Sequence, residues 1–254
     1  MNIIVEKTPA KLKIENLTKS YETVNILNNI SLNVNEGEFV CILGPSGCGK
    51  STFLRLIAGF EKPDSGHIYF DGEKIRGPGR ERIMVFQDFD QLFPWKTVLQ
   101  NIIFPMKINA KNKKDDALRE TAMKLINSVN LNGYEDYFPH QLSGGMKQRA
   151  ALARALASDS KMLLLDEPFG SLDAQTKEIL QQTIYKIWQE TKITMLFVTH
   201  DIQEAIILSS RIIIMDGNRR CIKKILTNSL DWPRTPSCAG FGSLWQDVYS
   251  LIKA

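Results

Sequence analysis

The sequence predicts an α/β fold in which a mostly parallel sheet is wrapped by helices. Continuously apolar runs, such as FVCIL at 39–43 and KMLLLDE at 161–167, have the composition of strands that are covered on both faces. Such runs alternate along the chain with segments of helical periodicity. Because this alternation is typical of strand–helix–strand units, we expect parallel strands joined by helices.

The first third of the chain is predicted to be mostly strands, with an N-terminal antiparallel part. Apolar and polar residues alternate in LKIENL and ISLNV as in half-buried strands. The predicted strands are LKIENL at 12–17, ISLNV at 30–34, FVCIL at 39–43, HIYFDG at 67–72 and RIMVF at 82–86. STFLRLIAG at 51–59 follows a glycine-rich segment and is predicted to be a short helix that stops at Gly59.

A helical subdomain is predicted from Pro94 to Ala157, inserted between 11–93 and 158–220, which form the core of a single domain. One face of a helix is marked by Leu118, Ala122, Leu125, Ile126 and Val129. The charged KNKKDD at 111–116 is expected to be a solvated loop.

Strands and helices are predicted to alternate again after the helical subdomain. These elements are KMLLLDE, a helix from Asp173 to about Thr191, TMLFVTH at 194–200, IQEAIILS at 202–209 and RIIIMDGN at 211–218. The tail, 221–254, is predicted to be a loop followed by a short amphipathic helix.

Composition excludes several classes of protein. A net charge of +4 is too mild for a dense basic face, so no nucleic acid is expected as a partner. No apolar run approaches the roughly 18–20 residues of a membrane span, and MNIIVEKTPAK lacks the pattern of a secretion signal. The four cysteines show no CxxC spacing, which argues against a zinc site and fits free thiols in a reducing cytoplasm.

The segment GPSGCGKST fits the phosphate-loop pattern G-x-x-x-x-G-K-[ST]. Glycines let the backbone turn its N–H groups around phosphate oxygens, and the following helix adds its positive N-terminal end. Lys50 would place a cation on the β and γ phosphates, and Ser51 a hydroxyl on Mg²⁺. The residues of this loop are Gly44, Pro45, Ser46, Gly47, Cys48, Gly49, Lys50, Ser51 and Thr52. Cys48 is expected to favour the thiolate, because it lies near a helix N-terminus.

Two adjacent carboxylates end the apolar strand KMLLLDE. Asp166 is a candidate for holding Mg²⁺ through its water shell, and Glu167 for polarising an attacking water. Taken alone, such a pair is equally compatible with a solvated turn. The phosphate loop upstream favours the catalytic interpretation.

A second glycine motif, LSGGMKQR at 142–149, is predicted to open a helix whose N-terminus faces a phosphate. The motif contributes Ser143, Gly144 and Gly145. A plain helix cap would explain Ser143 but leave both glycines without a reason.

Together these motifs, in this order, resemble the ATP-binding cassette (ABC) ATPases over about Leu12 to Asn218. The resemblance implies a P-loop NTPase fold of the ABC type and ATP hydrolysis with Mg²⁺. It also implies that Ser143, Gly144 and Gly145 contact ATP held by a second protomer. Met146 departs from the pattern, since many members have Gln there.

Four further residues match family positions. The resemblance implies that Gln87 reaches Mg²⁺ and the γ-phosphate side, and that His200 contacts the γ-phosphate. It implies that Asp173, in GSLDA, lies in a loop that crosses the dimer seam, and that Tyr21 stacks on adenine. An ordinary strand tyrosine is the alternative for Tyr21.

Two strings, GPGRERIMVFQ at 77–87 and QLFPWKTVLQNI at 91–102, resemble the nitrate/sulfonate/taurine import branch. That resemblance implies a homodimer or cassette pair on the cytoplasmic face of the membrane, bound to integral permease subunits and working with a solute-binding protein. Phe93, Pro94 and Trp95 are expected to form an exposed patch where the permease docks, within Gln87 to Val98. The alternative is a Trp95 buried in the helical subdomain.

Two rival functions stay open at this point. A soluble ABC ATPase that drives assembly or remodelling would carry the same motifs without a membrane partner. A small-molecule kinase would use the same phosphate loop but has no need for LSGGMKQR.

Overall fold

A computed structural model describes residues 10–88, 90–109, 114–170 and 172–253. The segment 1–9 of MNIIVEKTPAK and part of KNKKDD lie outside these ranges. The chain divides into two compact units, Met1–Pro78 with His200–Ala254, and Gly79–Thr199. Each unit is described by itself.

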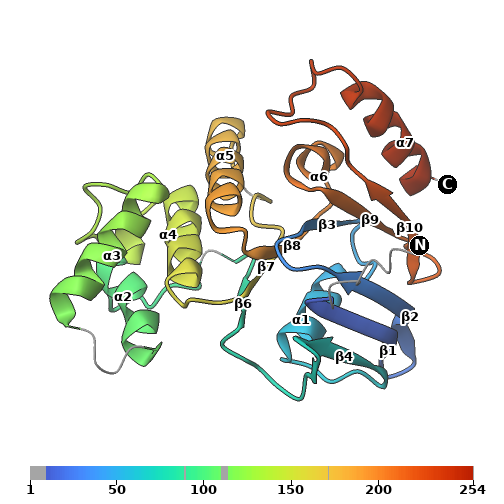
Figure 1. The fold of residues 1–254 in the computed structure, drawn as a ribbon, viewed down its shortest axis with the longest axis horizontal. Coiled ribbons are helices and arrows are strands. Elements are labelled where there is room, and N and C mark those ends of the chain that lie inside the picture. Colours follow the sequence, from blue (N-terminus) through green and yellow to red (C-terminus); the bar gives the residue numbers. More distant parts are fainter. Residues whose placement is uncertain (1–9, 89, 110–113, 171, 254) are drawn as a thin grey trace, which may run out of the picture. The chain divides into compact units, whose positions relative to one another are not determined.

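The first unit contains a four-stranded antiparallel sheet in the order β2-β1-β4-β5 (Figure 1). Its strands are β1 (Leu12–Tyr21), β2 (Val24–Val34), β4 (Ser65–Phe70) and β5 (Glu73–Lys74). The buried residues Leu12, Ile14 and Leu17 break strict alternation, because the register shifts between Ile14 and Leu17, where Asn16 has φ 49°. Beyond the predicted segments β1 and β2 carry mainly polar or half-buried residues, so their full length was not visible as a period-two pattern.

The first unit also contains a buried parallel pair, β3 (Phe39–Leu43) and β9 (Arg211–Met215). Its helices are α1 (Lys50–Ala58), α6 (Ile202–Leu208) and α7 (Phe241–Lys253). Helix α6 packs against β3, and α7 packs against α6 and β9 (Figure 1).

The prediction for the tail was incomplete, because it contains a strand, β10 (Ile222–Thr227), antiparallel to β9. Lys223, Lys224 and the exposed Ile225 lie in this strand, and none of its residues is buried. An edge strand without a buried face shows no alternation, so the sequence pattern could not reveal it.

The second unit is built on three parallel strands in the order β8-β7-β6, with the helix α5 (Ala174–Thr191). The strands are β6 (Arg82–Val85), β7 (Met162–Asp166) and β8 (Thr194–Thr199). A helical part follows β6, with α2 (Val98–Asn109), α3 (Asp115–Ser128), a 3-10 turn (Pro139–Gln141) and α4 (Gly144–Leu156). Helices α2, α3 and α4 contact one another, and α4 also contacts β6 and α5 (Figure 1).

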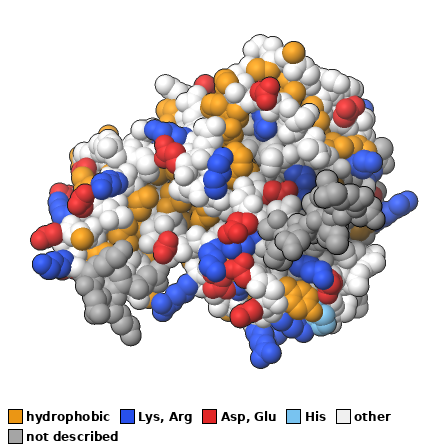
Figure 2. Space-filling model, viewed as in Figure 1, with side chains coloured by type: hydrophobic (Ala, Val, Ile, Leu, Met, Phe, Trp, Pro, Cys, Tyr) orange, Lys and Arg blue, Asp and Glu red, His pale blue; other side chains and the backbone are white. Residues whose placement is uncertain are grey.

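These parallel strands with intervening helices confirm the predicted fold class. Within the described ranges, no helix has both the length and the apolar character needed to cross a bilayer. Basic and acidic side chains are intermixed on the face drawn in Figure 2.

Candidate functional site

The glycine-rich loop of the first unit connects β3 to α1 and turns through left-handed backbone. Gly47 has φ 76° and Gly49 has φ 98°. A Cβ at Gly49 would lie 2.7 Å from the carbonyl oxygen of Ile26. Only glycine combines this conformation with so close an approach, which explains why the motif needs it here.

Lys50, at the first position of α1, is 4% exposed. Its Nζ donates hydrogen bonds to the carbonyl oxygens of Gly44 at 2.9 Å and Pro45 at 3.1 Å. The ammonium group is therefore held against the loop by the loop's own backbone. Ser51 and Thr52 follow in the first turn of the helix, where backbone N–H groups favour an anion.

The expectation for Cys48 is wrong. Its side chain is 1% exposed, and burial raises the pKa of its thiol even though the charge of Lys50 acts in the opposite direction. The sequence showed the nearby helix N-terminus but not the burial. At neutral pH Cys48 is a neutral thiol packed within the loop.

Tyr21 ends β1 with its side chain 42% exposed. Its hydroxyl donates to a carboxylate oxygen of Glu61, and the Nζ of Lys19 lies 5.4 Å from the ring centroid. Burial is the main cause that raises the pKa of its phenol. The exposed ring is available for stacking, which stays a prediction.

In the second unit, Asp166 is 6% exposed at the end of β7. Glu167 follows with φ 42°, and its backbone N–H donates to the carbonyl oxygen of Val198 at 3.0 Å. A left-handed glutamate is uncommon and strained, and such strain gathers at functional sites. The carbonyl oxygen of Glu167 accepts from Gly170 N–H at 3.1 Å, which closes a tight turn over residues 167–170.

Gln87 is exposed just after β6 and lies beside this turn. A Cβ on Gly170 would come 3.1 Å from Nε2 of Gln87. The structure therefore brings together three of the predicted site residues, Asp166, Glu167 and Gln87, at the ends of neighbouring strands.

The second glycine motif begins α4 as predicted. Ser143 is the N-cap, and its Oγ accepts from Met146 N–H at 3.3 Å. The structure gives a packing reason for glycine at position 145 that the sequence did not reveal. A Cβ there would lie 2.3 Å from Cγ2 of Thr176 on α5. Close packing of α4 against α5 thus requires this glycine, independently of any contact between its backbone and a phosphate.

Asp173 caps α5 and contacts the same threonine. Its carboxylate accepts from Thr176 N–H at 2.9 Å and from Thr176 Oγ1 at 2.7 Å. These donors lower the pKa of Asp173. Gly145 and Asp173 therefore both contact Thr176.

His200 is exposed and follows β8 in the chain. Its predicted contact with a γ-phosphate stays a prediction.

The predicted apolar patch is on the surface. Trp95 is 69% exposed, so the alternative of a buried tryptophan is wrong. The ring of Phe93 lies 5.6 Å from that of Trp95 and 4.9 Å from that of Phe104, measured between centroids. Arg154 supports the patch from α4, with its guanidinium 5.4 Å from the Phe93 ring and a hydrogen bond of 2.7 Å to the Gln91 carbonyl.

Comparisons with known proteins identify the family to which these motifs belong. The sequence profile of the ABC transporter family matches residues 27–170. The aliphatic sulfonates import ATP-binding protein SsuB of Bacillus cereus is 43% identical over 231 residues, which are 91% of this chain and 90% of that protein. The nitrate import ATP-binding protein NrtD of a Synechocystis strain is 45% identical over 208 residues, 82% of this chain and 77% of that protein.

The chain belongs to the ABC transporter ATP-binding family. Among solved structures, the ATP-binding cassette MJ0796, in a dimeric post-hydrolysis state bound to ADP and Pi, matches with a TM-score of 0.77. That match has 34% identity and covers 87% of this chain and all of the other. The predicted family and its ATPase activity are therefore confirmed.

Three residues of α4 that sequence reasoning missed connect the ABC glycine motif to the segment after β6. Gln148 is 1% exposed, and its side chain donates to the Phe86 carbonyl and accepts from Gln91, each at 3.3 Å. Lys147 forms an ion pair with Asp90 at 3.0 Å, and Arg154 bonds Gln91 as above. The sequence did not reveal these contacts, because partners about 60 positions away in the chain leave no local pattern.

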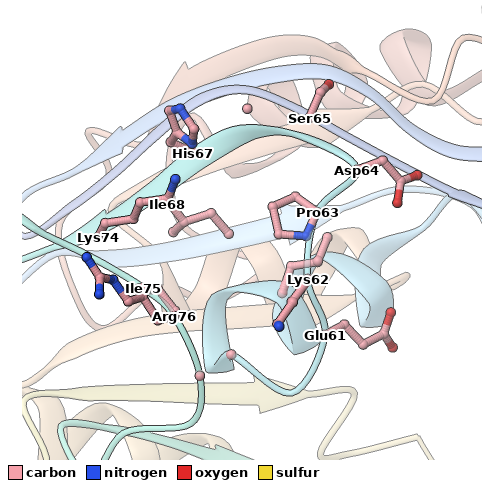
Figure 3. A pocket seen from close by; sticks show the side chains of 14 residues that line it. Glu61, Lys62, Pro63, Asp64, Ser65, His67, Ile68, Lys74, Ile75 and Arg76 are labelled. Carbon is pink, nitrogen blue, oxygen red and sulfur yellow. The ribbon is translucent and has the colours of Figure 1, made fainter.

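A separate cavity of about 500 Å³ lies on the antiparallel part of the first unit (Figure 3). Glu61, Lys62, Lys74 and Arg76 are among the side chains that line it. None of the predicted ABC site residues is in its lining.

Proposed function

We propose that the chain is the ATP-hydrolysing subunit of an ABC importer for a small solute such as a sulfonate or nitrate. The observation that carries the proposal is similarity over most of their length to two import ATP-binding proteins. Identities of 43% and 45% are too close to choose between the two solutes. Permease subunits and a solute-binding protein would select the cargo.

In this proposal the first unit supplies the groups that hold the nucleotide. Lys50 and the backbone N–H groups of the phosphate loop, 44–52, bind the β and γ phosphates. Tyr21 stacks on adenine. The buried position of Lys50 beside two loop carbonyls supports its role, since the cation is already desolvated and oriented.

The second unit supplies the carboxylates. Glu167 acts as general base on the attacking water, with Gln87 and His200 on the γ-phosphate side. The oxygen donors Ser51, Asp166 and Gln87 are of the kind that Mg²⁺ prefers, and the metal would neutralise developing phosphate charge when bound. The strained backbone at Glu167 supports a functional assignment for this turn.

Two copies, or a pair of related cassettes, would form the working enzyme. Ser143, Gly144 and Gly145 of one protomer then contact the ATP held by the other, and Asp173 lies at the seam. The dimeric state of the related cassette bound to ADP and Pi supports this arrangement.

The exposed patch of Phe93, Pro94, Trp95 and Phe104 is the proposed docking site for the integral permease, within Gln87 to Val98. The chain would then be peripheral, on the cytoplasmic face of the membrane. Gln91, Gln148 and Arg154 tie the patch to α4, so docking and the glycine motif would move together.

A co-purification experiment distinguishes an importer subunit from a soluble remodelling enzyme. Affinity-tagged chain is expected to recover a pair of integral membrane subunits from detergent-solubilised membranes. Trp95→Ala should lose them while keeping its fold, because the ring is 69% exposed. Trp232→Ala, at an aromatic position in the tail that is 37% exposed, is the matched control and should retain them. Recovery of a soluble scaffold instead would support the remodelling function.

A further inference from the structure

The turn between β9 and β10, residues 216–221, lies against the phosphate loop along its length. A Cβ on Gly44 would be 3.2 Å from the Cβ of Met215, where the turn begins. One on Gly217 would be 2.8 Å from Cγ of Pro45. At the far end of the turn, the guanidinium of Arg220 donates to the carbonyl oxygen of Gly47. The contacts thus follow the loop from its first residue to its tip.

At the tip of the loop, the Cβ side of Gly47 faces open space. A Cβ built on Gly47 meets no atom within 4 Å, whereas one on Gly44 or Gly49 would meet an atom at 2.8 Å or closer. Gly47 also has φ 76°, a conformation with the freedom of glycine. A hydrogen bond from a charged donor is therefore well placed to restrict this residue.

Hydrogen bonds within the turn and to β2 fix the backbone that carries Arg220. The carboxylate of Asp216 accepts from the backbone N–H groups of Asn218 at 2.8 Å and Arg219 at 2.9 Å. The backbone of Asp216 also pairs with Cys221 at 2.9 Å and with Arg220 at 3.0 Å. The carbonyl oxygen of Arg220 accepts from Asn28 N–H of β2 at 2.8 Å, which fixes the turn to the antiparallel sheet.

We propose that Arg220 is a positioning residue for nucleotide binding, which holds the Gly47 carbonyl outward so that the loop's N–H groups face the phosphates. In a phosphate-binding loop the N–H groups converge on the anion, and a carbonyl that rotated inward would oppose it. The inference rests on the proposed role of the loop in binding ATP.

The test compares Arg220→Ala with Arg219→Ala in the full chain. Arg219 is the preceding residue, is exposed and carries the same charge, so its removal controls for net charge and for general disturbance of the turn. Titration with a fluorescent ATP analogue should give a Kd raised roughly threefold to tenfold for Arg220→Ala, which is the size expected for the net loss of one typical hydrogen bond. Arg219→Ala should stay near wild type, and Arg220→Lys should recover part of the loss.

Steady-state kinetics and amide exchange separate positioning from damage to the fold. Positioning raises KM for ATP and leaves kcat at saturating ATP nearly unchanged, whereas a partly unfolded sample loses kcat at constant KM. Amides of 46–48 should exchange faster in nucleotide-free Arg220→Ala and match wild type when ATP is bound. Equal Kd values for Arg220→Ala and Arg219→Ala would overturn the inference. Normal ATP binding by Lys50→Ala would instead refute the proposed role of the loop.

Discussion

Gly145 at the start of α4 and Thr176 in the first turn of α5 are in such close contact that a single methyl group decides whether the two helices fit. A Cβ at Gly145 would lie 2.3 Å from Cγ2 of Thr176. The carboxylate of Asp173 accepts hydrogen bonds from both the N–H and the hydroxyl of Thr176. The glycine of the ABC motif is thus tied by packing to the loop that precedes α5.

This contact predicts the effect of Gly145→Ala on stability. Alanine gains up to about 1 kcal/mol of helix propensity, but the overlap with a stiff β-branched side chain costs about 1–3 kcal/mol, so the variant should be less stable. Thr176→Ser removes the methyl group and keeps the hydroxyl for Asp173. Urea unfolding of the double variant should therefore recover most of the loss.

ATPase activity of the same double variant separates the two roles of Gly145. If the glycine matters only for packing, activity should return together with stability. If its backbone must also approach a phosphate, stability should return while activity stays low, which our assignment predicts. A Gly145→Ala single variant as stable as wild type would show that the helices adjust without strain.

The buried thiol of Cys48 predicts slow alkylation. Burial raises the pKa of this thiol, so it is protonated at pH 7.5. Burial also makes the sulfur inaccessible to the reagent. Cys238 is half-exposed, and donors from Thr235 lower its pKa, so it should react first. Peptide mapping after timed iodoacetamide treatment should show Cys48 modified at least about tenfold more slowly than Cys238.

The alkylation rate of Cys48 should increase with pH. Because the pKa of Cys48 is raised from its ordinary value of 9.0, the thiolate forms only as pH rises above that value, and the rate should climb there. In urea all four cysteines should react alike. Rapid labelling of native Cys48 at neutral pH, with protection by ATP, would restore the idea of a reactive thiolate.

Glu167→Gln should separate ATP binding from hydrolysis. Glutamine keeps the shape of the side chain at this strained turn but cannot accept a proton, so hydrolysis should fall roughly 10²–10⁴-fold while ATP still binds. Glu190→Gln on the exposed end of α5 removes the same charge and should leave turnover unchanged. Phosphate release and nucleotide titration measure the two steps. Near-normal turnover in Glu167→Gln would remove it from the role of base.

The sequence was most informative where chemistry and periodicity coincide. Gly59 ends α1, as its residue type predicted, and α5 begins directly after Asp173, where the predicted helix starts. Of the two alternatives for Trp95, the exposed position is the one that the resemblance to the import branch favoured.

Other features depend on contacts between distant segments and left no local signal. Strand β10 has no buried face, so its pattern resembles that of a loop. Burial of Cys48 and the overlap of Gly145 with Thr176 are set by neighbours that the motifs do not contain. The contact of Arg220 with Gly47 joins residues 173 positions apart.

Mixing two inactive variants tests most directly whether one protomer completes the ATP site of another. Lys50→Ala removes the phosphate-loop cation, and Ser143→Arg blocks the glycine motif; each alone should be inactive. A mixed dimer keeps one site with an intact loop from one chain and an intact motif from the other. Random mixing should therefore restore about a quarter of wild-type phosphate release. Subunit exchange in the mixture is measured separately. If subunits exchange and the mixture is still as inactive as its components, Ser143 and Lys50 do not serve a shared site.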